Sequence, residues 1–428
     1  MAAGRAGGRL VQALVRGATG AVAISLILLA ACPATYAAGA PSATRSLAAL
    51  IEQGPKLSGA GEINHGAFGY SVGVSGDGST AIVGAPQDKH GAGAVWIFSR
   101  SGNTWAPQGG KITATGEVGH GYFGISVALS EDGDIALVGS PKDGKGVGAA
   151  YVFTRTGETW TQAAKFSGAE ELGHANFGRR ISLSSDGQTA LIGGFADNDN
   201  TGAAWVFIHL GESWTQQGPK LTGSSETGPG QFGGDVSLSG DGNTALVGGP
   251  TDDSGVGAAW FFSRSGDTWA AQGSKIAPSG EAAAAEFGRS VSLDGDGETG
   301  LVGGPTGNGG FGAAWVFAFN GEAWSQGARL TAPTTKGHPD FGRDVALSGT
   351  GETALVGAPK AHTTGGGEAW LFTLQVGEWV RQTEPLLGGA ETKHGDFGRS
   401  VALSDDADTA IVGGPKDHKF GAAWTYGE

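Results

Sequence analysis

Cysteine and methionine are almost absent from this sequence, and each occurs once in 428 residues. A single cysteine cannot form an internal disulfide, so packing has to stabilise the fold. The H-E-x-x-H, C-x-x-C and P-loop motifs are missing. The apolar run from Ala21 to Ala31 is too short for a transmembrane helix, and no other segment is apolar over the length that one needs. These absences exclude a disulfide-stapled domain and give no motif for zinc, redox or nucleotide chemistry.

Glycine, by contrast, is abundant, with 82 residues, and it is accompanied by 12 tryptophans and 19 phenylalanines. Collagen would need glycine at every third position, and a disordered chain would have few aromatic residues. Many glycines beside β-branched and aromatic residues indicate short strands joined by tight turns.

Acidic residues outnumber basic ones, and the formal net charge is −14. Residues 1–31 hold three arginines and no acid, so without them 24 basic residues face 41 acidic ones, a net charge of −17. An acidic surface of this kind repels phosphate backbones, so we do not expect nucleic acid as a partner.

The amino-terminal segment has the layout of a secretory signal peptide, which we assign to residues 1–31. Leu29-Ala30-Ala31-Cys32 resembles a bacterial lipobox, which would make Cys32 a lipidation site and the only membrane attachment. Ordinary cleavage after Ala37 remains the alternative. Residues 32–48 are expected to form a flexible tether. Either route predicts a protein that is secreted or held at the surface of the cell envelope.

A repeat of about 55 residues fills the rest of the chain, residues 49–428. The dipeptide Phe-Gly recurs at spacings of 55, 54, 55, 55, 54 and 56 residues, beginning at Phe68, Phe123, Phe177, Phe232, Phe287, Phe341 and Phe397. Each copy contains four short strand patterns, which we name A to D in chain order, with an Asp-Gly type turn between A and B. Four antiparallel strands repeated seven times predict an all-β, seven-bladed β-propeller.

The two ends of the chain support this prediction. The seventh copy stops inside strand C, at residues 421–426, and has no strand D. Residues 50–57 (LIEQGPKL) align with the strand D of another copy, residues 214–221 (WTQQGPKL). The amino-terminal strand would therefore complete the last blade and close the ring, which leaves no long free sheet edge. We accordingly expect a monomer.

The repeat resembles the FG-GAP family, best known from the propeller of the integrin α-subunit, and its motif sequence is most similar to the bacterial type. Phe68-Gly69 with Gly84-Ala85-Pro86, and Phe341-Gly342 with Gly357-Ala358-Pro359, match the motif literally. The other copies carry variants of Gly-Ala-Pro, and the resemblance covers residues 50–428. It implies an extracellular propeller used for adhesion or ligand contact.

The resemblance also implies calcium, which many family members bind in the A–B turn. Calcium needs six to eight oxygen ligands, and the turns of this chain are short. The fifth copy gathers three acids, Asp294, Asp296 and Glu298, and is a weak calcium candidate. The alternative is that these residues simply form a turn.

Arginines directly after Phe-Gly are the strongest candidates for a binding site. Copies three, five, six and seven have Arg179, Arg289, Arg343 and Arg399 at this position, which starts the innermost strand near the channel. Converging arginines could hold a carboxylate or an acidic glycan. Alternatively, each could pair with a nearby acid such as Glu286, Asp340, Asp344 or Asp396.

Two further sets of residues repeat regularly, and for both we favour a structural role. All twelve tryptophans fall on two positions of the repeat, which indicates packing between blades. Five histidines lie three residues before Phe-Gly, and an aspartate recurs in the B–C loop. We expect a His–Asp hydrogen bond to brace these loops.

Together these observations predict an exported, non-enzymatic module that recognises an extracellular protein or glycan. A lectin-like carbohydrate binder that uses the strand-D tryptophans and the four arginines is the alternative, and a polysaccharide hydrolase or lyase is the third interpretation. No catalytic residues are assigned.

Overall fold

The computed structural model describes residues 50–279, 284–333, 338–361, 366–392 and 394–428, all of which belong to the compact unit Ala43–Glu428. The expected signal peptide, the tether and Cys32 lie outside the described residues. Within the described ranges, no helix is long and apolar enough to cross a membrane.

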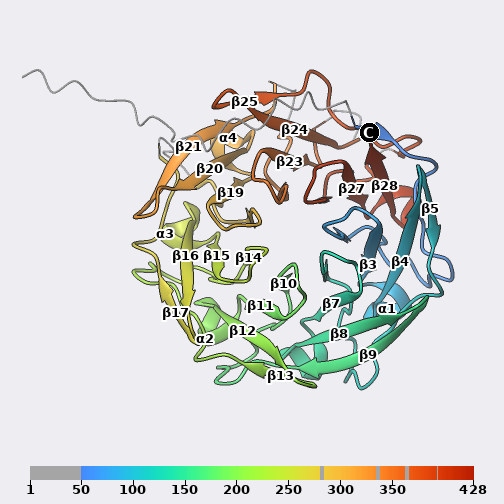
Figure 1. The fold of residues 1–428 in the computed structure, drawn as a ribbon, viewed down its shortest axis with the longest axis horizontal. Helices are drawn as coiled ribbons and strands as arrows, with labels where there is room; N and C mark the ends of the chain where they lie inside the picture. The colour runs from blue at the N-terminus through green and yellow to red at the C-terminus, as the bar shows by residue number, and fades with distance from the viewer. Residues whose placement is uncertain (1–49, 280–283, 334–337, 362–365, 393) are drawn as a thin grey trace, which may run out of the picture. The chain divides into compact units, whose positions relative to one another are not determined.

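Seven four-stranded antiparallel sheets are arranged radially around a central channel, so the chain forms the expected seven-bladed propeller (Figure 1). The innermost strands, position A, are β2 (Ser71–Val74), β6 (Ser126–Leu129), β10 (Arg180–Leu183), β14 (Asp235–Leu238), β18 (Ser290–Leu293), β22 (Val345–Leu347) and β26 (Ser400–Leu403). Position B holds β3 (Thr80–Ala85), β7 (Ile135–Ser140), β11 (Thr189–Gly194), β15 (Thr244–Gly249), β19 (Thr299–Gly304), β23 (Thr353–Ala358) and β27 (Thr409–Gly414). Position C holds β4 (Ala94–Ser101), β8 (Ala149–Thr156), β12 (Ala203–Leu210), β16 (Ala258–Ser265), β20 (Ala313–Phe319), β24 (Glu368–Gln375) and β28 (Ala422–Gly427). The outermost strands, position D, are β5 (Thr104–Pro107), β9 (Thr159–Phe166), β13 (Ser213–Gln216), β17 (Thr268–Ala271), β21 (Trp324–Leu330), β25 (Glu378–Arg381) and β1 (Ile51–Glu52).

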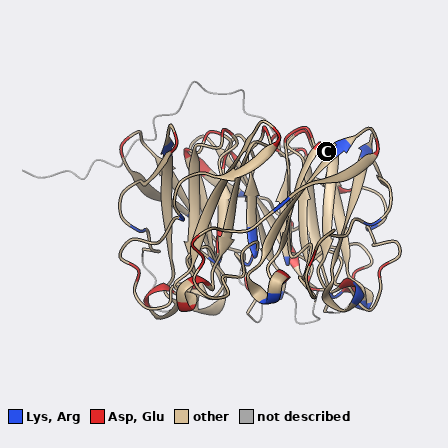
Figure 2. Cartoon of the chain, turned by 90° about the horizontal axis from the view of Figure 1, so that it is seen from below, with Lys and Arg blue, Asp and Glu red and all other residues tan. Residues whose placement is uncertain are grey.

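The propeller has two different faces. The A–B and C–D turns form one, which we call the A–B face, and the B–C and D–A loops form the other, the B–C face. Short helical turns lie in the B–C loops and mark the lower edge of the side view in Figure 2: α1 (Asp88–Gly91), η1 (Asp143–Gly146), α2 (Asp197–Asn200), α3 (Asp252–Gly255), α4 (Gly307–Gly310) and η2 (Asp417–Lys419).

The amino-terminal strand closes the ring, as the sequence predicts. β1 pairs antiparallel with β28, with Ile51 opposite Gly427 and Glu52 opposite Tyr426. Farther along, Leu57 forms a β-bridge with Ala423, as Leu221 does with Ala204 in the third blade. Residues from the two ends of the described chain thus share one sheet.

The Phe-Gly dipeptide has a physical explanation in the contacts between blades. Its phenylalanine is fully buried in all seven copies. Its glycine has a positive φ, for example 85° at Gly69, where a Cβ atom would lie 2.1 Å from the carbonyl oxygen of Ala422. Only glycine tolerates both the conformation and the close approach of another backbone.

Hydrogen bonds link each innermost strand to the next blade. The hydroxyl of Ser71 donates to the carbonyl of Gly124, and Ser400 in the last blade donates to the carbonyl of Gly69 in the first. On the A–B face, the backbone of one turn bonds to the next, as when Asp77 donates to the carbonyl of Glu131. The inner edges of the blades are therefore held in a fixed arrangement around the channel.

Apolar side chains fill the space between adjacent blades and form the core. In the cluster between the first and last blades, Phe68 packs edge-on against Trp96, with ring centroids 5.4 Å apart. Equivalent pairs recur around the ring, such as Phe177 with Trp205. The strand-C tryptophans are accordingly packing residues, as the periodicity predicts.

Candidate functional site

Four arginines lie at the B–C-face end of the innermost strands, in the position that the sequence indicates. Each follows a Phe-Gly dipeptide and is half-buried at the channel: Arg179, Arg289, Arg343 and Arg399. We call this set the arginine cluster. They come from the third, fifth, sixth and seventh blades, and closure of the ring brings them together.

Tyr70 from the first blade occupies the same position in the repeat and lies among these arginines. Its hydroxyl oxygen accepts hydrogen bonds from Nη2 of Arg399, at 3.1 Å, and Nη2 of Arg179, at 3.4 Å. The guanidinium of Arg399 also lies over the tyrosine ring, 4.9 Å from its centroid. The phenol therefore joins two blades that are not neighbours of each other.

Deeper in the channel, a fifth arginine forms an ion pair. Nε of Arg180 lies 3.4 Å from Oδ1 of Asp235, and Asp344 acts on the same guanidinium. Burial by itself would lower the pKa of Arg180, but the two carboxylates raise it above its ordinary value. These three residues line a cavity of about 140 Å³ together with Ser71, Ser126, Ser400 and several valines. The cavity can hold a few water molecules, and its one guanidinium and two carboxylates leave no excess of positive charge within it.

The nearby acids act on the cluster only through their charge: Glu286 acts on Arg289, and Asp340 and Asp344 act on Arg343. Asp340 pairs with Lys360, at 2.7 Å, and Asp396 pairs with Lys416, at 2.8 Å. Within the described part of the chain, the guanidinium group of neither Arg289 nor Arg343 has a hydrogen bond or ion pair, although the backbone of each donates to a carbonyl three residues earlier. Nε of Arg289 and Nη1 of Arg179 are buried donors without a partner, and such donors carry a desolvation cost of about 1–3 kcal/mol.

Burial and mutual repulsion weaken the hold of these arginines on their protons. Burial, followed by the charges of Arg399 and Arg289, lowers the pKa of Arg343 to about 9. Burial and the charges of Arg180 and Arg399 lower the pKa of Arg289 to about 10. Five arginines face two buried aspartates here, so five minus two leaves an excess of three positive charges while Tyr70 is neutral. The arrangement suits a negatively charged ligand.

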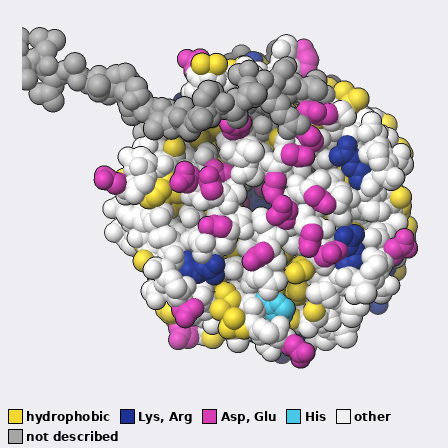
Figure 3. Space-filling model, in the orientation of Figure 1, with side chains coloured by type: hydrophobic (Ala, Val, Ile, Leu, Met, Phe, Trp, Pro, Cys, Tyr) yellow, Lys and Arg dark blue, Asp and Glu magenta, His cyan; other side chains and the backbone are white. Residues whose placement is uncertain are grey.

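The opposite mouth of the channel has the opposite charge. On the face in view in Figure 3, acidic side chains surround the opening of the channel. Burial, followed by the charge of Glu131, raises the pKa of Asp405 in one of these turns. An anionic ligand would therefore be repelled from the A–B face and attracted to the B–C face.

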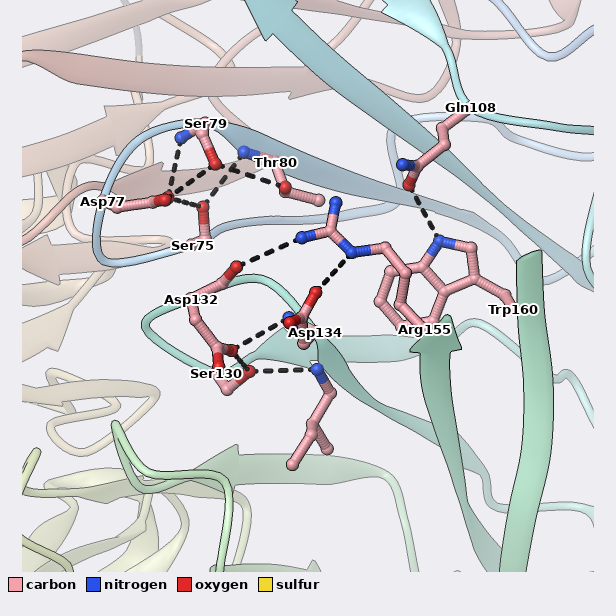
Figure 4. Close-up of polar contacts among 11 residues, drawn as sticks. Ser75, Asp77, Ser79, Thr80, Gln108, Ser130, Asp132, Asp134, Arg155 and Trp160 are labelled. Atoms are coloured by element: carbon pink, nitrogen blue, oxygen red, sulfur yellow. Dashed lines mark hydrogen bonds and ion pairs between the residues drawn. The ribbon is translucent and has the colours of Figure 1, made fainter. Parts of the chain in front are cut away.

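The A–B turns use their aspartates for their own structure. Figure 4 shows Asp77 accepting hydrogen bonds from Ser75 and Ser79, and Asp132 accepting from Ser130 and from the backbone of Asp134. Such bonds are typical of Asx turns.

The calcium candidate in the fifth blade follows the same plan. Asp294 is buried and accepts hydrogen bonds from the backbone of Glu298 and Thr299, while Asp296 and Glu298 are exposed. Burial raises the pKa of Asp294 to about 6. Among the described residues, no group of three or more His, Cys, Asp or Glu side chains is arranged to hold a metal ion. The three acids thus form a turn and do not converge as calcium ligands.

The expected His–Asp hydrogen bond is wrong. The B–C loop aspartates instead pair with a lysine that follows strand D of the same blade, as in Lys111–Asp88, at 2.8 Å, and Lys220–Asp197, at 2.5 Å. Each also accepts a backbone hydrogen bond from the D–A loop, for example from Leu172 to Asp197. The histidines three residues before Phe-Gly are exposed. The lysine side chain is long enough to reach the buried carboxylate from strand D. The histidines remain exposed, and Nδ1 of His338 lies 3.0 Å from the backbone carbonyl of Gly310 in a B–C loop.

The same lysine–aspartate pair secures the closing strand. Lys56, which follows β1, pairs with Asp417 in the last blade and lies over Trp424, 5.6 Å from the ring centroid. The fifth and sixth blades have Gly307 and Ala361 in place of the aspartate.

The strand-D tryptophans also serve contacts between blades. The indole of Trp160 donates to the side chain of Gln108 in the preceding blade, at 2.9 Å (Figure 4), and Trp269 donates to Gln217 in the same way. Their polar edges are therefore engaged by the protein, which weakens the structural support for a carbohydrate platform on strand D.

Sequence reasoning selected the four arginines and named Asp344 as a possible partner, but it assigned no role to three residues that lie with them: Tyr70, Arg180 and Asp235. A signal was present for Arg180, Asp235 and Asp344. At the second residue after Phe-Gly, four copies have serine, whereas the other three have Arg180, Asp235 and Asp344. A departure from the repeat at a channel-lining position was the available clue.

Comparison with known proteins agrees with this architecture. The FG-GAP repeat family matches residues 107–153, 160–207 and 324–372, and each match runs from the strand-D region of one blade through strand C of the next. No curated protein matches the chain. Among solved structures, Kuenenia stuttgartiensis hydrazine synthase is similar, with a TM-score of 0.54 and 15% identity over 80% of this chain and 91% of that chain. At this identity the likeness shows the fold alone. Three FG-GAP repeats are therefore matched within the seven closed blades of this β-propeller.

Proposed function

We propose that this propeller is an exported, non-enzymatic recognition module that binds an anionic group of an extracellular protein or glycan at the arginine cluster. The observation that carries the proposal is the convergence of four arginines around buried donors that have no partner among the described residues. A carboxylate or sulfate could accept hydrogen bonds from these donors and offset the repulsion between the guanidinium groups. The net negative charge of the rest of the molecule favours local, directed binding over general attraction of polyanions.

The size of the channel limits what can enter. The cavity of about 140 Å³ is lined by Arg180, Asp235 and Asp344 and by none of the four cluster arginines, so the anionic group would bind at the end of the channel, and the remainder of a larger ligand would rest on the loops of the B–C face. We also propose that the protein is exported, with a lipid anchor at Cys32. This part of the proposal rests on the amino-terminal sequence. The lectin-like alternative is supported for an acidic glycan that binds at the arginine cluster. The strand-D indoles are engaged between blades and give it little support.

The proposal is tested with an array of acidic and neutral oligosaccharides, together with isothermal titration of sodium sulfate. We expect acidic probes alone to bind, and Arg343→Glu or Arg399→Glu to lose that binding. The milder Arg343→Gln should weaken binding by roughly tenfold or more, because a hydrogen bond to a charged group contributes about 1.5–3 kcal/mol.

Lys145→Glu is the matched control, because Lys145 is an exposed cation on the same B–C face and its replacement changes the net charge equally. Unchanged binding in the folded arginine variants would overturn the proposal. Turnover of a bound oligosaccharide would contradict its non-enzymatic part.

A further inference from the structure

Tyr70 occupies the repeat position at which four other blades have an arginine, and its hydroxyl group engages two of those arginines. Its hydroxyl oxygen already accepts hydrogen bonds from Arg399 and Arg179. Nothing comparable engages Arg289 or Arg343 within the described ranges. The cluster is therefore divided into one half that holds the phenol and one half whose guanidinium groups face the channel without a partner.

The charged groups that act on the phenol are all positive. Arg179 and Arg180 reach it from the start of β10, and Arg399 reaches it from the residue before β26. Of the two carboxylates of the channel, Asp235 forms an ion pair with Arg180, and Asp344 acts on Arg180, Arg399 and Arg343. A phenolate at this position would be stabilised by three arginines, and by direct hydrogen bonds from two of them.

We propose that Tyr70 acts as an internal anion of the arginine cluster, so that an external oxyanion binds at Arg289 and Arg343 in competition with the charge of the Tyr70 phenolate. Binding of the oxyanion is then accompanied by partial protonation of the phenolate oxygen, with the proton taken from solvent. The ligand class is a compact oxyanion, such as a sulfate or carboxylate group. This inference rests on the proposed function and specifies which arginines hold the ligand.

The pKa of the Tyr70 phenol lies near neutral pH, where a coupling between sulfate binding and protonation can be measured. Burial alone would raise the pKa of Tyr70, but Arg179, Arg399 and Arg180 outweigh it and lower the pKa to about 7. The buried tyrosines Tyr151 and Tyr426 have their pKa raised well above the usual range by burial. Tyr70 is therefore the group whose ionisation a titration near neutral pH would follow.

The test is a spectrophotometric titration of the full chain, which follows the ultraviolet absorption of tyrosinate between about pH 5 and about pH 9. Tyr70→Phe removes only the hydroxyl group and should abolish the change in absorption, whereas Tyr122→Phe, at an exposed tyrosine on the B–C face, should retain it. Arg399→Gln should move the transition to higher pH.

Saturating sodium sulfate, whose charge is constant over this range, should raise the pKa of Tyr70 by about one unit. Linkage then requires sulfate affinity to fall roughly fivefold between about pH 6 and about pH 8, below the pKa of about 9 of Arg343, in the wild type and to stay nearly constant in Tyr70→Phe.

The outcomes separate this inference from the proposed function. If sulfate binds but the tyrosinate signal is missing or unaffected by sulfate, the role of Tyr70 is overturned while anion binding stands. If Tyr70 ionises near neutral pH but neither sulfate nor the acidic oligosaccharides bind, both are overturned. Equal loss of pH dependence in Tyr122→Phe would also refute the assignment.

Discussion

Closure of the ring by the amino-terminal strand makes a quantitative prediction about Leu57. Its side chain is 6% exposed and packs in the same cluster as Phe68 and Trp96. Leu221 occupies the equivalent position in the third blade, where it is 7% exposed. Because both side chains fill equivalent spaces between blades, Leu57→Ala and Leu221→Ala should destabilise the protein equally, by about 3 kcal/mol each. That corresponds to a change of roughly a hundredfold in the unfolding equilibrium constant.

The measurement is equilibrium urea denaturation followed by tryptophan fluorescence. Leu210→Ala is the control, because Leu210 is 60% exposed and its replacement should change the free energy of unfolding by less than about 0.5 kcal/mol. If Leu57→Ala behaves like this control while Leu221→Ala has its full effect, the amino-terminal strand does not hold the ring together in solution.

Three further predictions concern the turns and loops. Gly178→Ala should cost more than about 3 kcal/mol or prevent folding, because φ is 86° and a Cβ atom would lie 2.4 Å from the carbonyl of Ala149. Gly102→Ala, where nothing lies within 4 Å, should cost only about 1 kcal/mol, and equal effects in urea denaturation would contradict this account. Burial raises the pKa of Glu117 to about 7, so the folded state holds this proton more tightly than the unfolded state, and stability should fall as pH rises from about 4.5 to about 7. Glu117→Gln should reduce that fall in thermal melting, and exposed Glu158→Gln should not; an unchanged profile in Glu117→Gln would refute the assignment. Melting curves in calcium and in EDTA should superimpose, because the acids of the fifth A–B turn serve the turn itself; a higher melting temperature with calcium would show that they rearrange into a site.

The sequence by itself determined the architecture, because the architecture depends on a local pattern that is repeated. In each Phe-Gly dipeptide the phenylalanine ring is buried, and the glycine adopts a positive φ close to a neighbouring backbone, which other residues do not tolerate. The closing strand could also be recognised in the sequence, because residues 50–57 resemble the strand D of an internal copy. Periodicity also indicated that the tryptophans serve packing, and their bonds to glutamines of the preceding blade agree with this.

Side-chain pairing was decided by the tertiary structure. The sequence placed the B–C loop aspartates and the histidines on one face, but it gave no direction for either side chain. In the structure, the lysine that follows strand D reaches the buried carboxylate, and the histidine is left in solvent. A loop residue can pair only with residues on the same face of the propeller. Which of them it pairs with depends on the length and direction of the side chains.

The candidate site shows the same division most clearly. Its four arginines could be selected from the sequence because they recur at one position of the repeat. Their partner could not, because Tyr70 is 109 residues from Arg179 and 329 residues from Arg399. Only closure of seven blades into a ring brings these three side chains together at the channel, and no local pattern records a contact that depends on the whole circumference.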